Sequence, residues 1–303
     1  MFARRGEVQA ARAAQAAGIP FCLSTVGVCP IAEVKAGAPG EIWFQLYMIR
    51  DRAFMVTLLD QATAAGCTKL LFTVDLPMLG ARYRDYHSGL VGAPGARGDL
   101  RRLGQAPAAS ALDVGCRHAR QAAHARQHLA GAGRQSRPQG FLPLERRQSR
   151  SRITWRDIDW IRQRWKGQLI LKGILDAEDA VAAADAGADG IVVSNHGGRQ
   201  LDGVISAARA LPAIAEAVGD RLTVLADGGI RSGLDVVRML ALGARGVLLG
   251  RAWAFALAGN GGAGVAHMLA LLRAEMSIAM ALTGCVKIQD ISRNSLQPLD
   301  GNP

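Results

Sequence analysis

The chain has 303 residues, half of them hydrophobic, which is enough to bury a large core in one big domain or two small ones and excludes global disorder. No uncharged apolar run reaches about eighteen residues, so the sequence predicts no membrane-spanning helix. Five cysteines without CxxC spacing argue against a zinc site or a disulfide framework and favour a reducing compartment. Residues 1–18 lack the apolar core of a secretory signal and are predicted to begin a helix.

The net charge of +11 is concentrated in residues 91–150, where eleven arginines face three acidic residues, so only +3 remains for the rest of the chain. This stretch contains no lysine, and Phe141 is its one aromatic residue. Nucleic-acid or lipid binding would require aromatic stacking residues or an amphipathic helix, and neither pattern is present there. The basic stretch is therefore not interpreted as a binding surface for either partner.

Short β-branched runs alternate with amphipathic helical patterns outside this stretch, as in a parallel sheet built from βα units. Strands are predicted at Phe21–Thr25, Ile42–Leu46, Lys69–Val74, Leu169–Leu171, Gly190–Val193, Thr223–Ala226 and Gly246–Leu249. Helices are predicted over Ala53–Ala65, Ile158–Trp165, Ala177–Ala186 and Leu234–Leu242. Asp176 and Ser232 each precede an acid by three residues, which is typical of a helix N-terminus.

The predicted strands are about 20 to 35 residues apart except across a gap of about 100 residues between the third and fourth. One explanation is a long functional loop at the C-terminal end of a barrel strand. The other is a changed reading frame, because the composition switches abruptly to Ala, Arg, Gly and Gln after Gly89 and returns to ordered patterning at Ile153. The sequence leaves both open.

Candidate catalytic side chains follow the predicted strands directly. His196 lies after Gly190–Val193, within the run SNHGGRQ, and can act as a base near neutral pH. Arg199 in the same run can bind a carboxylate through two hydrogen bonds. Asp75 follows the third strand and could orient an imidazole. Lys172 closes the fourth strand, where a cation is costly unless an anionic group lies above the barrel.

Two glycine-rich loops near the C-terminus predict a phosphate site. The run Asp227, Gly228, Gly229, Ile230, Arg231 precedes a predicted helix, and Gly250 and Arg251 follow the last predicted strand. Exposed N–H groups, a helix N-terminus and a guanidinium group together bind phosphate well. The chain lacks GxGxxG at the start of a βαβ unit, so a dinucleotide in a Rossmann fold is not predicted.

These segments resemble the FMN-dependent α-hydroxy acid dehydrogenases and oxidases, and within that family the bacterial respiratory L-lactate dehydrogenases. The likeness runs through LSTVGVCPIAEV, WFQLYMIRDRAFM, LFTVDLPMLGARYRDYHSG and GADGIVVSNHGGRQLDG, and it covers nearly everything except residues 90–152. The resemblance implies an α/β fold, a (β/α)8 TIM barrel, expected here to be incomplete with its first strand missing. It implies a single FMN-binding domain over residues 1–303, interrupted by an atypical, poorly ordered segment at 90–152.

The resemblance also implies a role for each candidate residue. His196 would be the base, Asp75 would orient its imidazole, and Arg82, Arg199 and Tyr47 would bind the substrate. FMN would be bound by Ser24, Gln45, Thr73, Lys172, Asp227, Gly228, Gly229, Ile230, Arg231, Gly250 and Arg251. No metal is implied.

The implied reaction is oxidation of L-lactate, or another small L-2-hydroxy acid, to the 2-oxo acid, with electrons passed to a quinone or another acceptor. The expected location is the cytoplasmic side of the inner membrane, as a peripheral protein, or the cytoplasm, and a homo-oligomer is expected. The alternative is an inactive, truncated remnant of the family with impaired flavin binding, because the first barrel strand is expected to be absent and residues 90–152 resemble nothing in the family's loop.

Overall fold

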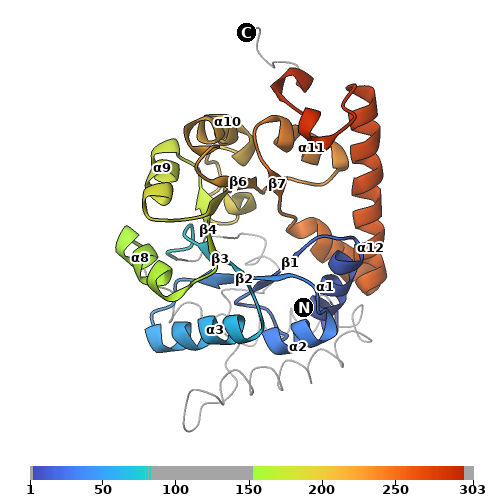
Figure 1. The fold of residues 1–303 in the computed structure, drawn as a ribbon. Helices are drawn as coiled ribbons and strands as arrows, with labels where there is room; N and C mark the ends of the chain where they lie inside the picture. The colour runs from blue at the N-terminus through green and yellow to red at the C-terminus, as the bar shows by residue number, and fades with distance from the viewer. Residues whose placement is uncertain (1–2, 79, 81, 83–152, 297–303) are drawn as a thin grey trace, which may run out of the picture.

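The computed structural model describes residues 3–78, 80, 82 and 153–296, so the predicted interruption at 90–152 lies outside the described residues. Within them, parallel strands alternate with helices that cover the outside of a curved sheet (Figure 1). The strands are β1 (Phe21–Ser24), β2 (Ile42–Tyr47), β3 (Lys69–Thr73), β4 (Gln168–Ile174), β5 (Gly190–Val193), β6 (Thr223–Ala226) and β7 (Gly246–Val247). The α-helices are α1 (Gly6–Ala16), α2 (Ile31–Gly37), α3 (Arg52–Ala64), α8 (Trp155–Arg164), α9 (Ala177–Asp185), α10 (Ala207–Val218), α11 (Gly233–Ala241) and α12 (Arg251–Leu282). The short 3-10 turns are η2 (His196–Gly198), η3 (Ile288–Asp290) and η4 (Arg293–Ser295).

The sheet has the order β1-β2-β3-β4-β5-β6-β7, and every neighbouring pair is parallel. Strand order therefore follows chain order, as it does in a (β/α) barrel. The predicted TIM-barrel class is confirmed, and the described part is an incomplete barrel with β1 and β7 at its two edges.

The predicted strands and helices agree with the observed ones to within a few residues, and the fourth strand differs most. It extends past the predicted Leu171 to Ile174 and contains a register shift between Lys172 and Ile174. Gly173 lies inside this irregularity with a φ of 110°, a conformation that favours glycine. The bulge changes the direction of the strand just where its functional lysine lies.

Two apolar layers hold the barrel wall together. On the outer face, strand residues such as Leu70, Leu169 and Ile191 are fully buried against the surrounding helices. On the inner face, one residue from each strand or strand end contributes to a second apolar cluster: Cys22, Trp43, Leu71, Ile170, Val192, Leu225 and Leu248. Burial raises the pKa of the Cys22 thiol to about 12, so this cysteine fills space rather than acting as a nucleophile.

By length and composition alone, α12 is long and apolar enough to cross a membrane, which the sequence analysis did not predict. Residues 252–272 contain no Asp, Glu, Lys or Arg, but Asn260, His267 and several glycines interrupt the apolar run. The helix is interrupted at Asn260 and Gly261, where the backbone is not helical. It packs against α1, where Gly262 N–H donates to Gln9 Oε1 (2.8 Å), yet Ile278 and Leu282 are exposed.

The two predicted helix caps are confirmed. Asp176 accepts hydrogen bonds from the backbone N–H groups of Glu178 and Asp179 at the start of α9. Ser232 and Asp235 form a capping box at the start of α11. Burial pushes the pKa of the Asp235 carboxyl upward, but donation from the Arg231 and Ser232 N–H groups and the nearby Arg238 guanidinium hold it below its ordinary value.

This capping box makes the stability of the protein depend on pH. A carboxyl with a lowered folded-state pKa contributes stability above its unfolded pKa and loses it as the pH falls through the folded value. We expect Asp235→Asn to lower the free energy of unfolding at pH 7 by about 1 kcal/mol, and the deficit to shrink as the pH drops below about 4. Urea unfolding at several pH values measures both. Asp220→Asn, at an exposed carboxylate, is the control, and an equal deficit for Asp235→Asn at every pH would contradict the assignment.

Candidate active site

The candidate site is formed by polar residues that lie directly beyond the inner apolar layer, toward the C-terminal ends of the strands. Alternate residues of a strand point to the same face of the sheet, so the residue two positions after each member of that layer also points inward, nearer the C-terminal end of the strands. These next residues are Ser24, Gln45, Thr73, Lys172, Ser194, Asp227 and Gly250. Six of the seven were predicted as site residues, and the C-terminal face is where barrels carry their active sites.

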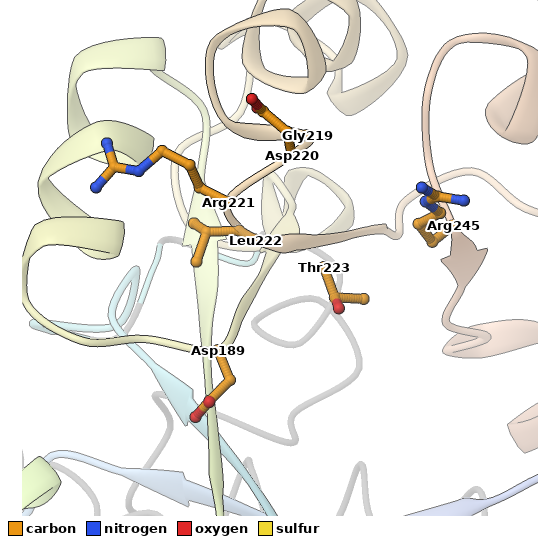
Figure 2. A pocket seen from close by; sticks show the side chains of 7 residues that line it. All are labelled: Asp189, Gly219, Asp220, Arg221, Leu222, Thr223 and Arg245. Carbon is orange, nitrogen blue, oxygen red and sulfur yellow. The ribbon is translucent and has the colours of Figure 1, made fainter.

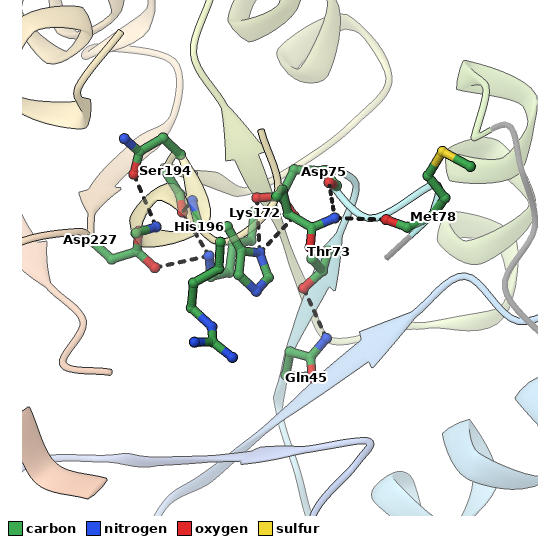
Figure 3. A network of polar contacts seen from close by, with 12 residues as sticks. Gln45, Thr73, Asp75, Met78, Lys172, Ser194, His196 and Asp227 are labelled. Carbon is green, nitrogen blue, oxygen red and sulfur yellow. Dashed lines mark hydrogen bonds and ion pairs between the residues drawn. The ribbon is translucent and has the colours of Figure 1, made fainter. Parts of the chain in front are cut away.

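A chain of hydrogen bonds joins the first three of these side chains. Ser24 Oγ donates to Gln45 Oε1 (2.9 Å), and Gln45 Nε2 donates to Thr73 Oγ1 (2.9 Å). Gln45 and Thr73 are buried although they are polar. A buried polar side chain is stabilised only when its hydrogen bonds are satisfied, so this row presents a fixed pattern of polar atoms on one wall of the barrel. Figure 3 shows the contact between Gln45 and Thr73.

Lys172 forms the centre of a second polar group. Its Nζ lies 2.9 Å from Asp227 Oδ2 and donates to Ser194 Oγ (2.8 Å), and both members of the ion pair are largely buried (Figure 3). Ser194 is fully buried and also accepts a hydrogen bond from the His196 N–H (3.0 Å). The cation predicted to need an anionic neighbour therefore has one within the protein, on the strand two places along the sheet.

His196 and Asp75 meet across two loops although they are 121 residues apart in the chain. His196 Nδ1 lies 3.0 Å and 3.1 Å from the two carboxylate oxygens of Asp75 (Figure 3). A carboxylate only accepts hydrogen bonds, so this contact assigns the imidazole proton to Nδ1 and leaves the Nε2 lone pair as the basic atom. This is the arrangement that the sequence predicted for an oriented base.

The loop that carries His196 holds it in a strained backbone conformation. His196 has a φ of 55°, in the left-handed region that non-glycine residues rarely adopt. Two side-chain acceptors stabilise the turn, because Ser194 Oγ accepts from the His196 N–H and Asn195 Oδ1 accepts from the Gly197 N–H (3.0 Å). The histidine is thus fixed at both its backbone and its ring.

Gly173 makes the room that Asp75 occupies. A Cβ at Gly173 would lie 2.6 Å from the Asp75 Cβ, which is closer than real side chains approach. The bulge in β4 and the missing side chain therefore act together to admit the carboxylate beside His196. The sequence signal for this space was the glycine directly after Lys172, to which the sequence analysis assigned no role.

The predicted substrate-binding residues lie around this pair. Arg82 Nε donates to the Arg199 carbonyl (3.2 Å), so the two arginines are brought together from different loops. Tyr47 ends β2 and is opposite Thr73 in the strand register, which places it at the same end of the barrel. All three belong to the same rim as His196.

Some backbone N–H groups of the first predicted phosphate loop already donate hydrogen bonds within the protein. The N–H groups of Arg231 and Ser232 donate to Asp235 Oδ2 (3.0 and 3.1 Å), and the Gly233 N–H donates to Glu275 Oε2 (2.6 Å). Two carboxylates therefore accept hydrogen bonds at the N-terminus of α11, and the phosphate role of the loop from Asp227 to Arg231 stays a prediction. Ile230 is likewise buried in the core, so its side chain serves packing.

The start of α12 is the second predicted phosphate site. Gly250 is its N-cap, and among the described residues no side chain caps this helix start. A Cβ at Gly250 or Gly229 would meet nothing within 4 Å, whereas Gly228 faces Asn195 Oδ1. Arg251 lies beside the opening, and its guanidinium donates to the Gly197 carbonyl (2.9 Å). Open glycine backbone, a helix N-terminus and a cation together fit a phosphate group.

One buried atom shows that the site fits a bound flavin nucleotide. Asp227 Oδ1 is buried and has no hydrogen-bond partner among the described residues, while its other oxygen pairs with Lys172. An orphaned acceptor of this kind is costly, and a hydroxyl of a ligand between Lys172 and the start of α12 would satisfy it. The ribityl chain of FMN carries such hydroxyls.

A separate polar pocket lies at the other end of the strands (Figure 2). It is lined by Asp189, Gly219, Asp220, Arg221, Leu222, Thr223 and Arg245, which precede or begin β5, β6 and β7. Arg162 bonds Asp189 (3.0 Å) and Arg221 bonds Asp185 (2.6 Å), so ion pairs connect the elements there. The N-terminal face of a barrel serves stability, and this pocket shares no residue with the site at His196.

Sequence reasoning missed two polar residues of the site. Ser194 was within the quoted motif but received no role, and its signal is its position two residues before His196 on the inward face. Gln200 ends the same motif, and its side chain donates to the carbonyl oxygens of Asp75 (3.1 Å) and Met78 (2.9 Å). No spacing rule predicts a contact between residues so distant in the chain.

Comparison with known proteins identifies the family. The sequence model of the FMN-dependent dehydrogenases matches residues 1–298. The chain is 59% identical over 307 residues to an L-lactate dehydrogenase of Caulobacter sp. (strain K31), covering 99% of this chain and 78% of that protein. It is 57% identical over 303 residues to an L-lactate dehydrogenase of Azorhizobium caulinodans, covering 98% and 77%.

Solved structures agree with the sequence matches. A monotopic membrane protein, (S)-mandelate dehydrogenase, superposes with a TM-score of 0.80 at 34% identity, covering 98% of this chain and 77% of that one. A mandelate oxidase mutant holding a C4a-OH-FMN adduct superposes with a TM-score of 0.75 at 36% identity, covering 96% and 74%. With a matched family, a shared barrel and a site that fits FMN, the chain belongs to the FMN-dependent dehydrogenase family.

Proposed function

We propose that this protein oxidises L-lactate, or a closely similar small L-2-hydroxy acid, to the corresponding 2-oxo acid with FMN as the electron acceptor in the site. The observation that carries the proposal is the contact of His196 Nδ1 with both oxygens of Asp75. A base with a fixed tautomer at the C-terminal mouth of the barrel is what removal of a proton from a hydroxy acid requires.

The proposed chemistry divides between the cofactor and the protein. Bound FMN would supply the oxidising equivalent, taking up two electrons and one of the two hydrogens as the C2–H and O–H bonds of the substrate break. His196 Nε2 would take one proton, and the Asp75 carboxylate would stabilise the resulting imidazolium.

Substrate orientation is assigned to the rim residues. Arg82 and Arg199 would bind the carboxylate, since guanidinium groups match carboxylate geometry, and Tyr47 would donate a hydrogen bond. Lactate is the favoured acid because the curated relatives of 59% and 57% identity are named L-lactate dehydrogenase. The solved neighbours are named for mandelate, at lower identity, which makes mandelate the competing substrate to test.

Flavin absorbance tests this proposal. We expect the purified protein to be yellow and its visible band to be bleached by L-lactate under anaerobic conditions, faster than by mandelate. His196→Gln should retain FMN but slow bleaching by about 10²- to 10⁴-fold, because loss of a general base costs that much. Ser277→Ala, in the exposed part of α12, is a neutral control. A colourless preparation, or a yellow one that L-lactate does not bleach, supports the inactive remnant instead.

Lys172 offers a test that does not depend on turnover. We propose that it faces the flavin edge that becomes negative on reduction, so its cation stabilises the reduced form. Lys172→Met should make the flavin midpoint potential more negative by about 30 mV or more, a tenfold change for a two-electron couple. Lys172→Arg should change it less, and exposed Lys166→Met should leave it unaltered. Spectroelectrochemical titration measures the potential, and a wild-type value for Lys172→Met would refute the role.

We further propose peripheral membrane contact on the cytoplasmic side, with a quinone or another acceptor receiving the electrons. Support comes from the exposed apolar residues Leu271, Ile278 and Leu282 of α12 and from the solved neighbour described as monotopic. Vesicles of bacterial lipid should co-sediment the protein, and Ile278→Glu with Leu282→Glu should reduce the bound fraction severalfold. Leu201→Glu, on a loop outside α12, is the control, and unchanged sedimentation of the double variant would contradict contact through α12.

A homo-oligomer stays a prediction that size measurement in solution would check.

A further inference from the structure

Gln200 joins the two loops that carry the proposed catalytic pair. It lies four residues after His196, beyond the turn η2, but its side chain extends to the loop after β3. There its Nε2 lies 3.1 Å from the Asp75 carbonyl oxygen and 2.9 Å from the Met78 carbonyl oxygen. Figure 3 labels Asp75 and Met78. The residue therefore connects the segment of the base to the segment of its orienting carboxylate.

The orientation of this amide follows from its partners. A carbonyl oxygen can only accept a hydrogen bond, so the end of Gln200 that faces two of them must be its NH2 group. Both of its N–H bonds are then used. The opposite end, Oε1, accepts from the guanidinium of Arg82 at 3.4 Å. One side chain thus contacts both the backbone of Asp75 and the side chain of Arg82.

The backbones of the two loops also touch directly. A Cβ at Gly80 would lie 2.3 Å from the Gln200 carbonyl oxygen and 2.5 Å from that of Arg199. Arg82 Nε donates to the same Arg199 carbonyl (3.2 Å). Close approach at Gly80 and the bonds from Gln200 therefore set the distance between the loops, and with it the separation of His196 and Asp75.

We propose that Gln200 is a positioning residue for catalysis, which holds Asp75 against His196 through its NH2 group and Arg82 in its substrate-binding place through its carbonyl oxygen. This role rests on the proposed function, because it assigns Gln200 to the same reaction. It separates into two effects. Loss of the NH2 bonds releases the Asp75 backbone and should slow the chemical step, while loss of the bond to Arg82 should weaken binding of a carboxylate.

Gln200→Met tests both effects, since methionine has a similar length and keeps neither hydrogen-bonding group. The rate constant for anaerobic flavin reduction by saturating L-lactate should fall by roughly 3- to 30-fold, as expected for the loss of two or three hydrogen bonds that hold a catalytic group. The dissociation constant of pyruvate, measured from its perturbation of the oxidised flavin spectrum without turnover, should rise by about two- to tenfold. Flavin content should stay at the wild-type level.

Gln9→Met is a matched control. Gln9 also bonds at both ends, donating to the Arg4 carbonyl (2.7 Å) and accepting from the Gly262 N–H (2.8 Å), but it links α1 to α12 away from the site. It should leave the reduction rate and the pyruvate affinity unchanged. If Gln200→Met does not fold, Gln200→Asn carries the test with the same expected losses, because its shorter amide cannot span both loops.

The outcomes separate the two proposals. A wild-type flavin that L-lactate does not bleach overturns the proposed function and this role together. A reactive wild type beside a folded Gln200 variant whose reduction rate and pyruvate affinity are both within twofold of wild type overturns the role of Gln200 alone. Losses equal to those of Gln9→Met would also overturn it, since they would reflect general destabilisation.

Discussion

Each parallel strand directs every second side chain toward the barrel interior. The site exists because, on neighbouring strands, these inward side chains change from apolar to polar at the same height along the barrel. Ile170 and Val192 belong to the closed apolar layer, while Lys172 and Ser194 are the next inward residues on the same strands. The register of the sheet aligns these changes across neighbouring strands. A slip of one residue in any strand would turn its polar side chain outward, so the hydrophobic pattern that folds the barrel also assembles its chemistry.

The catalytic pair depends on a second constraint, contact between loops distant in the chain. β3 and β4 are paired although the chain between them is long, so the loops after β3 and β5 lie close to each other. The loops then make their own contacts, from the imidazole to the carboxylate and from the Gln200 amide to the backbone. The β4 bulge at Gly173 makes room for the carboxylate between them. The sheet brings the two loops close together, and these polar contacts fix the positions of His196 and Asp75.

Much of this could be predicted from the sequence because the signals are local. The strand Gly190–Val193 is a short apolar run followed at once by SNHGG, and the capping box at Ser232 is a spacing of three residues. Other features depend on partners that spacing does not reveal. Glu275, from α12, accepts a hydrogen bond from the Gly233 N–H at the start of α11, although the two residues are 42 positions apart. The length of α12 was missed because its alanine-rich sequence lacks a clear polar face, and the contacts of Gln200 arise only in the folded chain.

The left-handed backbone at His196 has a consequence for evolution at this position. A φ of 55° is tolerated by glycine and asparagine at lower energetic cost than by histidine, so the backbone conformation taken alone favours replacing the residue that performs the proposed chemistry. Selection for folding alone would then remove the imidazole. The chain nevertheless has histidine in this turn, where Ser194 binds its backbone N–H and Asp75 binds its ring. A strained residue of this kind is expected where selection favours activity over thermostability.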